Sequence, residues 1–199
     1  MNTPNKLTVA RIIATPFFMA AMLLAYKFNW LYIVALVLFI GASLTDMIDG
    51  KMARKYNLVT DFGKFLDPLA DKMLTTAAYL GFISMYGTNP TYRWQVTAIA
   101  FIVLFREFMV SSIRLVVVSS GGKVIAANIW GKSKTVSQMI GIILALAAYA
   151  AMYVCDCLAK YQNIFDIVIM VFFWISAVLC VISGVIYLNG SKQYINSSK

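Results

Sequence analysis

Long apolar stretches separated by short polar segments dominate the hydropathy pattern of this chain. Six of them are close to, or above, the roughly 20 residues that a helix needs to cross a bilayer. They cover residues 7–26, 31–48, 65–86, 94–118, 136–154 and 164–188. Because a segment inside lipid must satisfy its backbone hydrogen bonds internally, each stretch is expected to be an α-helix. The pattern predicts an all-α integral membrane bundle of six transmembrane helices.

The overall composition agrees with a membrane protein and not with a soluble domain. The 199 residues are 61% hydrophobic, which is too apolar for a soluble domain of this length. We see no linker or low-complexity segment that divides the chain, so residues 1–199 are expected to form a single membrane domain. The three cysteines, Cys155, Cys157 and Cys180, lie in or beside apolar stretches, and their odd number favours free thiols over a disulfide framework.

Basic residues are concentrated on alternate connections between the apolar stretches. They precede the first stretch, separate the second from the third and the fourth from the fifth, and follow the sixth, whereas the other connections carry only Lys27, Arg93 and Lys160. The positive-inside rule places the lysine- and arginine-rich connections in the cytoplasm. We therefore expect a multi-pass cell-membrane protein with both termini in the cytoplasm. The net charge of +9 reflects this orientation, and nucleic acid is not an expected partner.

Four aspartates interrupt the apolar pattern around the second and third stretches. Asp46 and Asp49 are three residues apart, and Asp67 and Asp71 are four apart, so each pair lies on one face of a helix. A carboxylate deep in lipid is disfavoured by roughly 2.5–3.5 kcal/mol on insertion scales. Several carboxylates close together also repel one another. The cluster therefore predicts a bound cation.

The residue types around these aspartates indicate which cation and which ligand. The chain has no histidine, and its cysteines lie elsewhere, so the ligands would be oxygen atoms, which favour Mg²⁺, Mn²⁺ or Ca²⁺ over zinc or copper. The small residues Gly50, Ala53 and Gly63 would let a ligand approach the backbone closely. Arg54 could hold a phosphate through its planar guanidinium. Together these residues predict a metal–pyrophosphate site.

The same segment resembles the signature of the CDP-alcohol phosphotransferase family. Asp46 to Arg54 reads D-x-x-D-G-x-x-A-R, and after eight residues Gly63 to Asp71 reads G-x-x-x-D-x-x-x-D, without a departure from the family pattern. The N-terminal segment from Pro4 to Arg11 is similar to the P-N-x-L-T-x-x-R with which members often begin. The resemblance implies transfer of a phosphatidyl group from the membrane lipid CDP-diacylglycerol to an alcohol, with release of CMP. It also implies a homodimer. The positive-inside rule, in turn, places the aspartate motif, and with it the active site, on the cytoplasmic side.

The resemblance also implies roles for particular residues. Two divalent ions, Mg²⁺ or Mn²⁺, would be held by the four motif aspartates, Asp46, Asp49, Asp67 and Asp71. The last of them, Asp71, would be the catalytic general base for the acceptor hydroxyl. Residues of the motif and of the N-terminal segment would bind CDP, namely Asn5, Thr8, Gly50, Ala53, Arg54 and Gly63. Asn5 or Thr8 could instead simply cap the first helix, and Pro68 places Asp67 near a helix start or a kink.

Charged residues inside the fourth stretch and before the fifth suggest a second binding region. Glu107, Ser111 and Arg114 fall on one helical stripe, and they indicate either an internal ion pair or a pocket for a phosphorylated acceptor. Lys132 and Lys134 either contact lipid headgroups or reach back over the aspartates.

Residues 105–108 and 130–135 resemble the bacterial branch of the family whose acceptor is sn-glycerol 3-phosphate. The acceptor phosphate would then be bound by Arg106, Arg114, Lys132 and Lys134. Two other interpretations stay open: the same chemistry with inositol phosphate, serine or phosphatidylglycerol as acceptor, and a cation transporter. A transporter has no evident use for Gly50, Ala53, Arg54 and Gly63. Asp166, near the outer end of the sixth stretch, is expected at a membrane interface and is assigned no chemistry.

Overall fold

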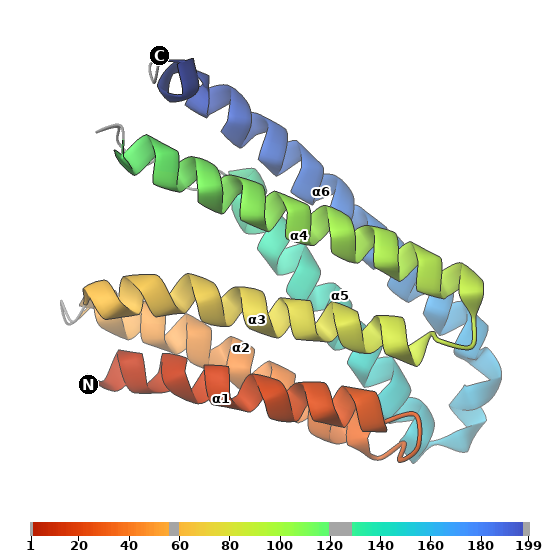
Figure 1. Cartoon of the computed structure of the whole chain (residues 1–199). Helices are drawn as coiled ribbons and strands as arrows, with labels where there is room; N and C mark the ends of the chain where they lie inside the picture. The colour runs from red at the N-terminus through yellow and green to blue at the C-terminus, as the bar shows by residue number, and fades with distance from the viewer. Residues whose placement is uncertain (1, 56–59, 120–128, 197–199) are drawn as a thin grey trace.

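The computed structural model describes residues 2–55, 60–119 and 129–196. Within these ranges, some side chains near the ends of the segments lie outside the description, namely Asp49, Lys51, Ala53, Arg54, Lys55, Asp61, Phe62, Lys64, Phe65 and those of residues 118–119 and 193–196. The described chain contains six long α-helices, one short 3₁₀ helix and no strand (Figure 1). Their bounds are α1 Thr3–Leu24, α2 Leu31–Lys55, α3 Asp61–Met85, α4 Pro90–Ser119, α5 Ile129–Val154, η1 Asp156–Tyr161 and α6 Gln162–Asn196.

The prediction of an all-α bundle with six long helices is confirmed. Among the described residues, α1, α2, α4, α5 and the segment that contains α6 are long and apolar enough to cross a membrane, judged by length and composition. The sixth helix, α3, has 25 residues and carries the second half of the aspartate motif. Several helices continue past the apolar stretches that predicted them, because backbone hydrogen bonding goes on into polar residues. Hydropathy marks where lipid contact ends and not where the helix ends.

The helices pack around a core of aromatic and small side chains. α1 lies along both α2 and α3, while α6 packs against α4 and α5. Phe18 of α1 meets Phe39 of α2 with ring centroids 5.6 Å apart, and Phe82 of α3 meets Phe173 of α6 at 5.3 Å. Many large apolar side chains point outwards, Phe101 among them at 68% exposed, as expected for a surface that faces lipid.

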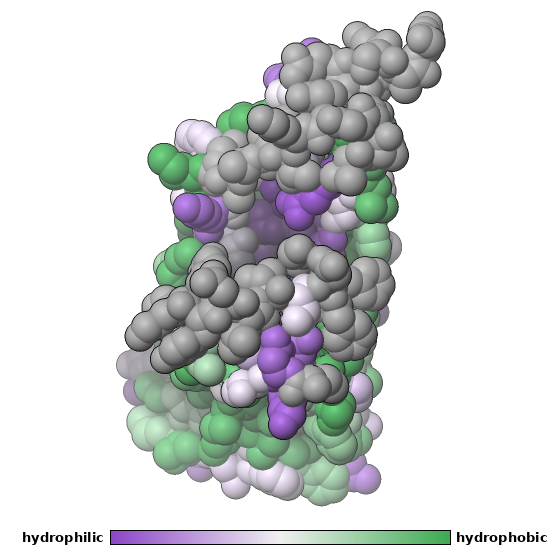
Figure 2. Space-filling model, turned by 90° about the vertical axis from the view of Figure 1, so that its left-hand side faces the viewer, coloured by the Kyte–Doolittle hydropathy of each residue, from purple (hydrophilic) through white to green (hydrophobic). Residues whose placement is uncertain are grey.

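The aspartate motif and both chain ends lie at the same end of the bundle. The start of α1, the end of α2, the start of α3 and the end of α6 all lie on the left of Figure 1, with the end of α6 at the top, apart from the other three. Figure 2 shows the molecule from this end. Hydrophilic residues gather in a hollow of the described surface, and hydrophobic residues lie to its sides. The bundle thus presents a polar end, and the aspartate motif lies there.

Two helix starts differ from the sequence prediction. The cap of α1 is Asn2, whose side chain accepts a hydrogen bond from the Asn5 backbone N–H at 3.1 Å, so neither Asn5 nor Thr8 caps this helix. Thr60 caps α3 by accepting a hydrogen bond from the Gly63 N–H at 3.0 Å. Because this cap starts α3 earlier than expected, Asp67 lies in its second turn and not at its start.

Candidate active site

The two halves of the aspartate motif lie on different helices that face the same region. Asp46 lies in the last turns of α2, and Asp67 and Asp71 lie one turn apart on α3. All three are half-buried, and Asp71 is close enough to Asp46 for their like charges to interact. Asp49 follows Asp46 by one turn of α2, but its side chain lies outside the described residues. The structure therefore brings Asp46 and Asp71 together from separate helices.

Two buried side chains of α1 contact these aspartates directly. The Thr8 hydroxyl donates a hydrogen bond to Asp67 Oδ1 at 2.8 Å, and Arg11 forms an ion pair with Asp46 Oδ1. Thr8 is 1% exposed and Arg11 is 2% exposed. The sequence analysis did not assign Arg11 to the site. The signal was available, since Arg11 is a charge inside an apolar stretch and such a charge needs an anionic partner.

Asn5 and Gly63, both predicted to bind CDP, lie in the contact between α1 and α3. The Asn5 side-chain amide donates to Thr60 Oγ1 at 2.9 Å. A Cβ added to Gly63 would lie only 2.8 Å from Asn5 Oδ1. This close approach gives Gly63 a packing reason to be glycine. Gly50 lies half-buried on α2, and the side chains of Ala53 and Arg54 lie outside the description, so their CDP-binding role stays a prediction.

A second polar cluster joins α4, α5 and α6 around Glu107. Arg106 Nη1 lies 3.0 Å from Glu107 Oε1, and the Lys134 ammonium forms an ion pair with the same oxygen. Arg106 Nη2 also donates to Ser183 Oγ at 2.6 Å. An internal ion pair therefore exists in the fourth helix. Its partners are the neighbouring Arg106 and a lysine from another helix, and not Arg114.

The four residues predicted to bind the acceptor phosphate are only partly brought together. Arg106 and Lys134 share Glu107, as described above. Arg114 is exposed and lies near Lys72, whose ammonium donates a hydrogen bond to the Ser111 hydroxyl. Lys132 is exposed and lines a separate groove of about 370 Å³ between α5 and α6.

Asp71 connects the aspartates with the basic cluster. Besides Asp46, it interacts electrostatically with Glu107, Lys134 and Arg11. Lys72, the next residue along the chain, extends the cluster to Ser111 of α4. Sequence reasoning did not assign Lys72 to the site, although it is a charge within a predicted span, and it left Glu107 open between an internal ion pair and an acceptor pocket. The arrangement combines carboxylates that can bind cations or accept protons with cations that can bind phosphate.

The described side chains do not by themselves complete a metal centre. No three carboxylate, histidine or cysteine side chains among them converge as a metal ion would require, and the Asp49 side chain lies outside this set. The available donors, Asp46, Asp67 and Asp71, are all carboxylates. Their chemistry fits a hard divalent cation.

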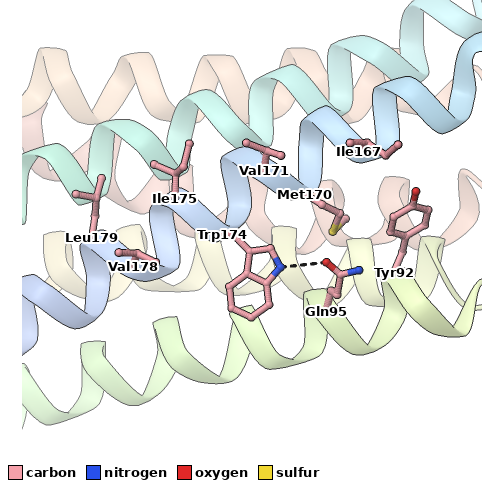
Figure 3. Close-up of a pocket in the computed structure, with 9 residues that line it drawn as sticks. All are labelled: Tyr92, Gln95, Ile167, Met170, Val171, Trp174, Ile175, Val178 and Leu179. Carbon is pink, nitrogen blue, oxygen red and sulfur yellow. Dashed lines mark hydrogen bonds between the residues drawn. The ribbon is translucent and has the colours of Figure 1, made fainter.

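Two further cavities lie away from the aspartates. An apolar groove of about 570 Å³ runs between α4 and α6, where the Trp174 indole donates to Gln95 Oε1 at 3.0 Å (Figure 3). A polar cavity of about 680 Å³ at the opposite end of the bundle has Asp166 in its wall. Tyr86 and Tyr149 donate to Asp166 Oδ1 at 2.8 and 2.7 Å, so Asp166 is buried in a hydrogen-bond network at this end of the bundle.

Comparison with known proteins agrees with the motif. Residues 1–186 match the model of the CDP-alcohol phosphatidyltransferase family. The chain is 36% identical to the CDP-diacylglycerol–glycerol-3-phosphate 3-phosphatidyltransferase of Bacillus subtilis, over 99% of this chain and 98% of that protein. Proteins of the same name from Rickettsia bellii and Haemophilus influenzae are each 35% identical, over 97% and 96% of this chain and 97% and 94% of their own lengths. The chain therefore belongs to the CDP-alcohol phosphatidyltransferase family.

Proposed function

We propose that this protein is a phosphatidylglycerophosphate synthase of the cell membrane. It transfers the phosphatidyl group of CDP-diacylglycerol to the 1-hydroxyl of sn-glycerol 3-phosphate and gives phosphatidylglycerophosphate and CMP. The observation that carries this proposal is that Asp71 of the motif lies within electrostatic range of both Asp46 and the Glu107–Lys134 ion pair. The relatives named for this reaction match nearly the whole chain, which supports the same acceptor here.

Asp71 would act as the general base, as the family resemblance implies. The acceptor hydroxyl forms a new bond to the phosphorus that bears the diacylglycerol, and the bond from this phosphorus to the CMP oxygen breaks. The hydroxyl proton passes to the Asp71 carboxylate, and the leaving CMP carries away the electron pair of the broken bond. A positioned base of this kind typically contributes about 10²- to 10⁴-fold to the rate.

The motif aspartates would hold the divalent ions. Asp46 and Asp71 interact although both are acidic, and such neighbours are stabilised by a cation between them. Asp46, Asp49, Asp67 and Asp71 would hold two Mg²⁺ or Mn²⁺ ions, as the family resemblance implies. When bound, these ions would neutralise the pyrophosphate and the charge that develops on CMP.

The basic cluster would bind the phosphate of the acceptor. Arg106 and Lys134 share one carboxylate, Glu107, so their combined charge exceeds that of their partner. Lys72 and Arg114 add positive charge on the Ser111 side. This excess suits a phosphorylated acceptor and gives no advantage to serine, which has no phosphate. The cytoplasmic orientation of this end and the homodimer belong to the same proposal.

A transfer assay with a panel of acceptors tests the proposed function. The purified protein is incubated with CDP-diacylglycerol, and release of CMP is measured with sn-glycerol 3-phosphate, inositol phosphate, serine or phosphatidylglycerol. We expect saturable release with sn-glycerol 3-phosphate and little with the others. EDTA should abolish turnover, and Mg²⁺ or Mn²⁺ should restore it. Faster CMP release with another acceptor would mean that this acceptor, and not sn-glycerol 3-phosphate, is the substrate. No CMP release with any acceptor would favour the alternative of a cation transporter.

A further inference from the structure

The two halves of the aspartate motif depend on a third helix for their relative position. α2 carries Asp46 and α3 carries Asp67 and Asp71, but these two helices contact each other little. α1, in contrast, packs extensively along both of them, as its position in Figure 1 shows. A shift of α1 would therefore move the two halves relative to each other.

One turn of α1 makes a polar contact with each half. Thr8 donates to Asp67 of α3, and Arg11, three residues later on the same face, pairs with Asp46 of α2. The Thr8 hydroxyl also lies 3.2 Å from the Pro4 carbonyl, but the 2.8 Å contact with the charged carboxylate is the shorter and stronger one. Both side chains are almost completely buried, so packing restricts their rotamers.

We infer that Thr8 and Arg11 are positioning residues that align Asp67 and Asp46 for a shared divalent-metal site. This inference rests on the proposed function, because the divalent-metal site is part of that proposal. Each α1 side chain contacts Oδ1 of its aspartate, which leaves Oδ2 of the same carboxylate for a metal ion. Partners that hydrogen-bond a metal ligand typically change metal affinity about 10- to 100-fold when they are removed. The family resemblance, in contrast, predicts that Thr8 contacts CDP.

A valine substitution separates these two roles. Thr8→Val keeps the branched shape but removes the hydroxyl, whereas Thr8→Ser restores the hydroxyl. Thr15→Val is the matched control, because Thr15 is a buried threonine of the same helix whose hydroxyl bonds to the Arg11 backbone carbonyl at 2.9 Å. Mn²⁺ binding is measured on each purified full-length protein without substrate, from the electron paramagnetic resonance signal of free Mn²⁺.

We expect Thr8→Val to bind Mn²⁺ about 10- to 100-fold more weakly than the wild type. Thr8→Ser and Thr15→Val should bind it as the wild type does. In the transfer assay, Thr8→Val should need a correspondingly higher Mn²⁺ concentration, with an unchanged KM for CDP-diacylglycerol at saturating Mn²⁺. Arg11→Lys, which keeps the charge but loses the planar guanidinium, should weaken Mn²⁺ binding as well and serves if Thr8→Val does not fold.

Mn²⁺ binding and phosphatidyl transfer, measured together, distinguish a failure of the positioning role from a failure of the metal site or of the proposed function. Wild-type Mn²⁺ affinity in Thr8→Val, or a raised KM for CDP-diacylglycerol without a change in Mn²⁺ affinity, overturns the positioning role. A wild type that transfers the phosphatidyl group but binds no Mn²⁺ overturns the metal site and this inference with it. If the wild type binds Mn²⁺ and Thr8→Val binds it more weakly, but the wild type transfers nothing, the proposed function is overturned and the inference is supported.

Discussion

At the scale of single residues, Asp71 lies within electrostatic range of both Asp46 and the Glu107–Lys134 ion pair. Asp71→Asn keeps the size of the side chain and one coordinating oxygen but cannot accept a proton. We expect kcat to fall about 100-fold or more, as for other positioned general bases, while CDP-diacylglycerol binding is largely kept. Steady-state kinetics and nucleotide-lipid binding on one preparation check this. Asp156→Asn, an exposed aspartate at the other end of the bundle, is the control. Near-normal kcat in Asp71→Asn would remove its role as the base.

Arg114 and Arg106 are predicted to respond differently to the same substitution. Arg114 is exposed, so Arg114→Gln should leave the melting temperature nearly unchanged. If Arg114 binds the acceptor phosphate, its loss should weaken acceptor binding by roughly 1.5–3 kcal/mol and raise the KM for sn-glycerol 3-phosphate far more than that for CDP-diacylglycerol. Arg106→Gln should also lower the melting temperature, because Arg106 contacts both Glu107 and Ser183.

Both KM values and the melting temperature decide this prediction when they are measured on the same preparations. An Arg114→Gln protein with unchanged KM values would exclude Arg114 from the acceptor site. An Arg106→Gln protein as stable as the wild type would show that the contacts around Glu107 contribute little to folding.

At the scale of helices, the close contact between α1 and α3 depends on a glycine. A Cβ added to Gly81 of α3 would lie 2.8 Å from both Cβ and Cε of Met22 on α1, and Met22 Cβ cannot rotate away. Overpacking of this kind typically costs about 1–3 kcal/mol, which exceeds the gain of about 1 kcal/mol from replacing a helical glycine by alanine. Gly81→Ala should therefore lower the melting temperature.

Gly41→Ala is the matched control for the α1–α3 contact. Gly41 is also helical, on α2, and an added Cβ would meet nothing within 4 Å in the described structure. This substitution should leave the melting temperature unchanged or raise it. Equal melting temperatures for the Gly41→Ala and Gly81→Ala proteins would mean that α1 and α3 do not pack as closely as described.

The polar network at the other end joins three helices through one buried carboxylate. Tyr86, which follows α3 as its C-cap, and Tyr149 of α5 both donate to Asp166 of α6. Tyr86→Phe removes one charge-assisted hydrogen bond and should destabilise the protein by roughly 1.5–3 kcal/mol. Thermal unfolding in detergent measures this, with Tyr153→Phe, an exposed tyrosine of α5, as the control. Equal loss in both variants would contradict a specific role for the network.

At the scale of the whole molecule, the orientation in the membrane can be tested with the native cysteines. Cys155 and Cys157 are exposed at the end opposite the aspartates, whereas Cys180 is buried. If the aspartate end faces the cytoplasm, a membrane-impermeant maleimide added to intact cells should label this protein. The Cys155→Ser/Cys157→Ser protein should not be labelled. Lys192→Cys in that background, exposed near the end of α6, should react only after permeabilisation. The reverse pattern would place the site outside the cell and contradict the use of a cytosolic acceptor.

The sequence determined the helices and the family because both follow from local patterns. A run of apolar residues long enough to cross a bilayer must form a helix, and this requirement predicted all six. The aspartate spacing, read with the small residues and Arg54, predicted the family that the comparison confirms. The carboxylates also indicated a cation, since their mutual repulsion follows from their spacing alone. That metal site stays a prediction.

Only the tertiary structure decided which residues compensate the buried charges. The pattern shows that Arg11 and Glu107, as charges inside apolar stretches, need partners, but a helix brings only neighbours three or four residues away onto its own face. Arg11 meets Asp46 across two helices, and Lys134 meets Glu107 across two others. These pairs depend on how α1, α2, α4 and α5 pack, which is set by the shapes of many side chains together. For the same reason, hydropathy could not predict the hydrogen-bond network in which Tyr86 and Tyr149 bury Asp166.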